Sequence, residues 1–98
     1  MVTNIAACHF TAIDDPRALA GGLRERAAAR ALPGTVLVAG EGINLFLAGD
    51  EGAIEGFLAP LGADPRFAGL RVKYSRSAAQ PFARLRVAPL VDGMDAAA

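Results

Sequence analysis

Residues 34–49, GTVLVAGEGINLFLAG, decide the fold of this chain. Two apolar runs, 35–39 and 43–48, flank Gly40-Glu41-Gly42, and this pattern is typical of a β-hairpin. Gly40 and Gly42 can adopt the positive φ that a tight reversal usually requires. Because both faces of both runs are largely apolar, we expect the two strands in the middle of a sheet rather than at its edge.

The rest of the chain predicts one further strand before the hairpin, two helices and two later strands. A strand over 2–13 precedes a helix over 16–31, for which Asp15 is the expected N-cap. Asp50 is the expected N-cap of the second helix, and alternating runs at 70–75 and 84–87 follow it. This order predicts an α+β, ferredoxin-like (acylphosphatase-like) βαββαβ sandwich with an extra C-terminal strand. Two helices would cover one face of an antiparallel sheet over residues 1–90, and residues 91–98 would form a flexible tail.

Composition indicates a single folded domain. The chain has 98 residues, of which 53% are hydrophobic and 20% charged, and this balance argues against disorder. No apolar run approaches the roughly 20 residues of a membrane span, and no secretion signal is recognisable. The single cysteine, Cys8, cannot form an internal disulfide. We therefore expect a cytoplasmic protein that does not contact a membrane.

Positive charge gathers in the last third of the sequence, although the net charge is zero. Residues 66–86 contain six basic and no acidic side chains. If the last strand joins the same sheet, its cations and those of the preceding strand could form one positive surface for RNA phosphates. The alternative is a solvated sheet face kept soluble by its charges. The candidate RNA-binding residues are Arg71, Lys73, Arg76, Arg84 and Arg86.

Catalytic chemistry finds little support in the sequence. Cys8 and His9 are adjacent, so in a strand they point to opposite faces and cannot form a nucleophile–base pair. With one histidine and one cysteine there is no metal-ligand constellation, and no cofactor motif is present. The hairpin glycines lack the lysine and hydroxyl residue of a phosphate-binding loop. Glu41, Gly42 and Asn44 remain candidate residues should the hairpin loop bind a ligand.

Three familiar functions of such a fold can be tested on the residues. RNA-recognition domains carry several aromatic residues on their central strands, whereas the run 43–48 supplies only Phe46. Acylphosphatases use an arginine in a glycine-rich loop after the first strand, and residues 11–15 contain neither arginine nor glycine. A small-molecule sensor would need a polar pocket, for which the sequence gives no signature. We expect none of these three functions.

Several segments together resemble one protein family. Glu41-Gly42-Ile43-Asn44, Asp64-Pro65-Arg66-Phe67 and Gln80-Pro81-Phe82, with Val72-Lys73 and Arg84, resemble the N-terminal domain of the rhodanese-related tRNA uridine hydroxylases over about residues 4–87. The resemblance implies a role in hydroxylating the wobble uridine of tRNA, with catalysis by a cysteine in a rhodanese-like domain. Cys8 does not match that cysteine, and residues 88–93 lack the basic stretch usual after the last strand.

These considerations predict a non-catalytic accessory domain that helps to bind tRNA. A rhodanese-like domain in cis or in trans would be its partner, and these 98 residues alone would catalyse nothing. The alternative is a protein-interaction or dimerisation module that uses the open sheet face or the edge of the last strand. The sequence leaves the oligomeric state undetermined.

Overall fold

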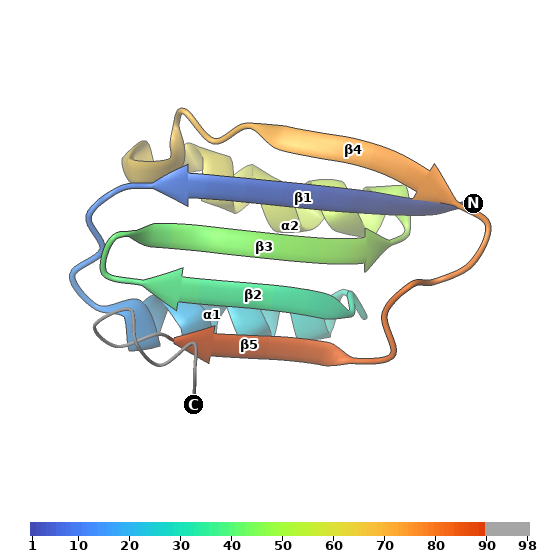
Figure 1. Cartoon of the computed structure of the whole chain (residues 1–98), viewed down its shortest axis with the longest axis horizontal. Helices are drawn as coiled ribbons and strands as arrows, with labels where there is room; N and C mark the ends of the chain where they lie inside the picture. The colour runs from blue at the N-terminus through green and yellow to red at the C-terminus, as the bar shows by residue number, and fades with distance from the viewer. Residues whose placement is uncertain (90–98) are drawn as a thin grey trace.

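The computed structural model describes residues 1–89, which form a sheet covered on one side by two helices (Figure 1). The elements, in chain order, are β1 (Val2–Phe10), α1 (Pro16–Ala29), β2 (Gly34–Ala39), β3 (Gly42–Gly49), α2 (Glu51–Ala63), the short 3-10 helix η1 (Pro65–Phe67), β4 (Val72–Ser77) and β5 (Leu85–Pro89). The predicted ferredoxin-like fold with an extra strand is confirmed. The tail predicted for residues 91–98 lies outside the described residues.

The sheet is mixed rather than antiparallel throughout. Its strand order is β4-β1-β3-β2-β5, and β1, β3, β2 and β4 pair antiparallel with one another. β5 pairs with β2 in parallel, so the predicted all-antiparallel sheet is wrong at this strand. The reason is the path of residues 78–84, which carry the chain from the β4 edge along one end of the sheet to the opposite edge (Figure 1). The chain therefore enters β5 at the end where β2 also begins.

The β2–β3 hairpin is central, as its apolar runs predicted. β3 lies between β1 and β2, and Ala39 pairs with Gly42 around the two-residue turn Gly40-Glu41. Gly42 has φ of 156°, and a Cβ there would overlap the carbonyl oxygen of His9 on β1. Gly40, by contrast, does not adopt positive φ. Gly42 is therefore needed because β1 approaches it closely.

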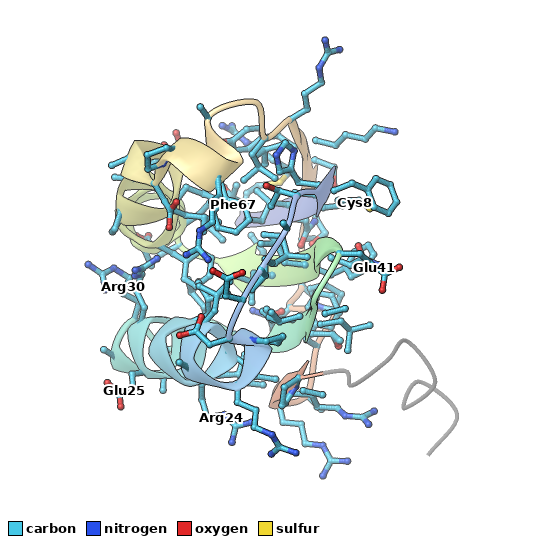
Figure 2. All side chains as sticks on the ribbon, turned by 90° about the vertical axis from the view of Figure 1, so that its left-hand side faces the viewer. Cys8, Arg24, Glu25, Arg30, Glu41 and Phe67 are labelled. Atoms are coloured by element: carbon cyan, nitrogen blue, oxygen red, sulfur yellow. The ribbon has the colours of Figure 1, made fainter. Side chains whose placement is uncertain are left out.

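Alternation along the strands separates a buried face of the sheet from an open one. Side chains of β1, β2 and β3 that point toward the helices form the core with the apolar stripes of α1 and α2. Phe67 of η1 is buried between the sheet and the helix layer, whereas Cys8 points to the opposite side (Figure 2). The largest fully buried side chains are Phe57, Phe67, Leu23, Leu32, Leu45, Leu47, Ile54, Val36 and Val38.

The helix ends follow the sequence signals in part. The carboxylate of Asp50 caps α2 by accepting from the backbone N–H of Gly52, as expected. Asp15 occupies the N-cap position of α1, as expected, but its side chain makes no capping hydrogen bond. α1 also ends at Ala29 rather than at Ala31, because Ala31 adopts φ of 53° and the chain turns away.

No helix in the part of the chain that the structure describes is long and apolar enough to cross a membrane.

The close approach of β1 to the hairpin predicts the effect of two alanine substitutions. Gly42→Ala should lower the free energy of unfolding by about 2 kcal/mol or more, because its Cβ overlaps the β1 backbone and the φ is unfavourable. Gly21→Ala is the matched control, since a Cβ there meets nothing within 4 Å and α1 should gain about 0.5–1 kcal/mol. Urea unfolding of both variants measures the difference. Equal stability of the two would contradict the packing described here.

Candidate nucleic-acid interface

The candidate site is the face of the sheet that points away from α1 and α2, which we term the open face. Cations border it on both sides: Arg71 and Lys73 at the β4 edge, and Arg84 and Arg86 at the β5 edge. β1, β3 and β2 separate the two pairs. These four cations therefore share one face, but they form two borders rather than one continuous stripe.

The strand register places two of these cations in one row with an aromatic residue. Lys73 pairs with Ala6, Ala6 with Phe46, Phe46 with Thr35, and Thr35 with Arg86. Residues paired across neighbouring strands point to the same face. Lys73, Ala6, Phe46, Thr35 and Arg86 thus form one row across the whole open face, which we term the central row. Phe46 is in its middle and a cation stands at each end.

Phe46 is uncovered because its neighbours in the central row are small. Ala6 and Thr35 cannot reach over the phenyl ring, which leaves Phe46 39% exposed. Two hollows adjoin it on the open face, and both are also lined by Ala6 and Lys73. One of them adds Cys8, Asn44 and Arg71, and the other adds Asn4, Ser75 and Phe82. The ring therefore stands between two hollows, each bordered by a cation.

Four of the five predicted RNA-binding cations are free to meet a ligand. Arg71, Lys73, Arg84 and Arg86 are exposed, and among residues 1–89 none of them forms a salt bridge. Arg76 differs, because alternation along β4 turns it to the helix side, where its guanidinium lies 3.1 Å from the carboxylate of Glu51. The structure therefore separates Arg76 from the other four.

Arg66 also lies outside this group. Its guanidinium donates to the carboxylate of Asp64 at 2.8 Å, and its backbone N–H donates to the same carboxylate. The side-chain hydrogen bond from Arg66 is the main cause that lowers the pKa of Asp64, and the backbone hydrogen bond adds to it. The same side-chain bond raises the pKa of Arg66. The segment Asp64-Pro65-Arg66-Phe67 is thus a structural turn that brings Phe67 into the core.

Negative charge is kept off the sheet. No strand in residues 1–89 carries an acidic side chain. The acidic residues of this part of the chain lie on the helices or in loops: Asp14, Asp15, Glu25, Glu41, Asp50, Glu51, Glu55 and Asp64. A polyanion that approaches the open face therefore meets cations along its two borders and one carboxylate, Glu41, at the hairpin end.

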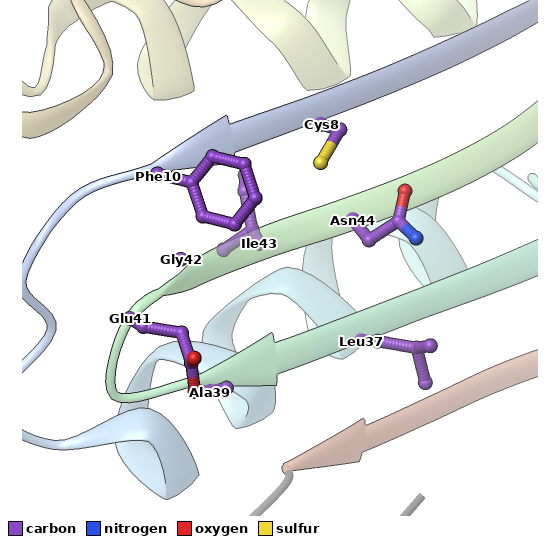
Figure 3. A pocket seen from close by; sticks show the side chains of 8 residues that line it. All are labelled: Cys8, Phe10, Leu37, Ala39, Glu41, Gly42, Ile43 and Asn44. Atoms are coloured by element: carbon purple, nitrogen blue, oxygen red, sulfur yellow. The ribbon is translucent and has the colours of Figure 1, made fainter. Parts of the chain in front are cut away.

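The hairpin candidates Glu41, Gly42 and Asn44 lie around a shallow hollow of about 330 Å³ at the end of the open face where the β2–β3 turn lies (Figure 3). Gly42 has the structural role given above. Asn44 stands between Cys8 and Leu37 and makes no side-chain hydrogen bond within residues 1–89. Phe10, which is 79% exposed, borders the same hollow.

Backbone hydrogen bonds join the loop between β1 and α1 to the turn of the hairpin. The backbone N–H groups of Thr11 and Ile13 donate to the carbonyl oxygens of Glu41 and Gly40, at 3.0 and 2.9 Å. These two donors are therefore unavailable to a phosphate group. The described residues also hold no group of three metal-ligating side chains.

Gln80 positions the segment that links β4 to β5. Its side-chain N–H donates to the carbonyl oxygen of Ala48 at 2.9 Å, and its Oε1 accepts from the backbone N–H of Phe82 at 3.1 Å. Gln80 thereby fixes the crossover to the end of β3 and places Phe82 in the hollow beside Phe46. Gln80-Pro81-Phe82 and the lone Phe46 stand out in the sequence, but their proximity depends on contacts between residues far apart in the chain.

Residues 2–89 match the UPF0176 acylphosphatase-like domain. The chain belongs to this family. The tRNA uridine(34) hydroxylase of Xanthomonas campestris pv. campestris (strain B100) is 64% identical over 87 residues, which cover 89% of this chain and 34% of the relative. The resemblance found in the sequence is thus confirmed, and the chain spans about a third of the length of that relative.

Solved structures support the fold of this UPF0176 domain. Acylphosphatase from Bacillus subtilis superposes with a TM-score of 0.65 at 18% identity, covering 90% of this chain and 99% of that one. The BLUF protein BlrB in its dark state gives a TM-score of 0.73 at 17% identity, covering 92% and 72%. At these identities the likeness concerns the fold alone.

The crossover bonds predict the effect of shortening Gln80. Gln80→Ala should lower the free energy of unfolding by about 1–2 kcal/mol, since it removes a donor to Ala48 and the acceptor for Phe82. Hydrogen exchange at the Phe82 amide should accelerate, while exchange at the Ala7 amide in β1 should follow global stability alone. Unchanged exchange at Phe82 would show that Gln80 does not hold the crossover.

Proposed function

We propose that this domain is a non-catalytic accessory module that helps to hold tRNA while a rhodanese-like domain, in cis or in trans, hydroxylates the wobble uridine. The names of its relatives and their greater length support this role. The charge of the open face supports it from the structure, because cations border this face and no strand of the described sheet carries a carboxylate. A domain that handles tRNA would act in the cytoplasm, and we include this location in the proposal.

The observation that carries the proposal is the pair of cationic borders on one face. Phosphate contacts need exposed, unpaired lysine and arginine side chains more than they need sequence-specific groups. Arg71 and Lys73 supply such groups at one edge, and Arg84 and Arg86 supply them at the other. An ordinary solvated face would be expected to mix both signs of charge, whereas the strands described here carry no carboxylate.

A second function is favoured by one specific observation. Phe10 is 79% exposed and borders the hollow at the hairpin end of the open face. An exposed aromatic ring beside an apolar hollow is a common feature of protein interfaces. The alternative is therefore a protein-interaction or dimerisation module, whose association would be weakly sensitive to salt and independent of RNA.

The proposal predicts salt-dependent binding of tRNA. Bulk tRNA should bind to the domain at low salt and dissociate steeply as salt rises, because each neutralised phosphate contributes to the salt slope. Arg84→Glu combined with Arg86→Glu should weaken binding by about tenfold or more. The matched control is Arg76→Glu, which reverses one charge on the helix side and should have a much smaller effect. Fluorescence anisotropy measures all three.

Light scattering on the same samples separates the two candidate functions. A salt-sensitive tRNA complex of a monomer supports the accessory role. A clean dimer without tRNA binding would refute it and favour the interaction module.

A further inference from the structure

We infer that the central row is a binding site for single-stranded RNA, with one base stacked on Phe46 and neighbouring phosphates held by Lys73 and Arg86. This inference rests on the proposed function and adds to it the form of RNA and the residues that recognise it. The RNA strand would run across the sheet, from the β4 edge to the β5 edge. The pairing register that aligns these side chains is the basis of the inference.

The spacing of the row suits such a ligand. Lys73 and Arg86 each lie two strands away from Phe46, so their backbones are roughly 10 Å from that of Phe46 at ordinary strand spacing. Long, flexible lysine and arginine side chains can span part of that distance. The two cations can therefore contact phosphates on either side of a nucleotide whose base lies on the ring.

The surroundings of Phe46 favour an unpaired base. Ala6 and Thr35 leave the ring uncovered, and the two hollows beside it can accept the edges of a flat group. Stacking on an aromatic side chain requires an unstacked base, which single strands offer and regular duplexes do not. Asn44 lies two residues before Phe46 on the same face and provides an amide donor and acceptor for a base edge.

Charge also decides between possible occupants of the open face. A second copy docked face to face would bring the cationic borders of both molecules together, and like charges in close apposition are destabilising. A polyanion with exposed bases can place its phosphates beside the cations and a base against the apolar centre of the face. A single-stranded RNA segment is therefore the occupant that the whole face fits.

The test compares a fluorescent short oligouridine with an RNA duplex of the same length, each titrated at several salt concentrations. Phe46→Leu should weaken oligouridine binding by about tenfold and leave the salt slope unchanged, because it removes stacking and no charge. Lys73→Gln and Arg86→Gln should each reduce the salt slope by about 0.7, the contribution of one phosphate contact in a single strand. Arg76→Gln removes a cation of β4 from the opposite side and should change neither quantity.

Each result bears on the inference separately from the proposed function. The assignment of the central row as a single-strand site would be wrong if Phe46→Leu left oligouridine affinity unchanged, or if duplex RNA bound as tightly as oligouridine. Binding of tRNA to the domain would then still support the proposed function. Absence of binding to both tRNA and oligouridine would overturn both proposals. Urea unfolding of every variant shows that it is folded, and because Phe46 is partly exposed at the open face, leucine there leaves the core intact.

Discussion

The rest of this structure depends on the burial of one face of β3. Ile43, Leu45 and Leu47 point into the core, and strand alternation therefore fixes Asn44 and Phe46 on the opposite side. β3 has a hydrogen-bonded neighbour on each side, so its register cannot shift without exposing the core. An aromatic ring on the open face of a central strand is thus held in place by the same interactions that stabilise the fold.

The borders of the open face carry cations alone, whereas the helix layer carries both signs of charge. The helices cover the apolar side of the sheet and carry carboxylates, among them Glu51 and Glu55, which bind Arg76 and Tyr74 at the β4 edge. Arg71, Lys73, Arg84 and Arg86 have no such partner among residues 1–89 and remain free at the borders of the open face. Gln80 leads the chain across the end of the sheet, so that β5 adds a second cationic border beside β2.

Much of the fold could be predicted from the sequence, because it rests on local signals. The glycine-punctuated hairpin, the apolar stripes of the helices and the Asp50 cap each depend on residues close together in the chain. The parallel direction of β5 and the alignment of Lys73, Phe46 and Arg86 could not be predicted, since both depend on pairing between distant strands. Strand alternation alone separates Arg76 from Lys73, whereas the ion pair of Arg76 with Glu51 of α2 depends on packing between distant residues.

The central claim is that RNA lies along the central row, and NMR titration tests it most directly. On adding oligouridine to the isotope-labelled domain, the largest amide shift changes should follow Lys73, Ala6, Phe46, Thr35 and Arg86 across all five strands of the described sheet. Residues of α1 and α2 should change little. Shifts confined to the helix layer, or to the hairpin end around Phe10 and Glu41, would contradict the account.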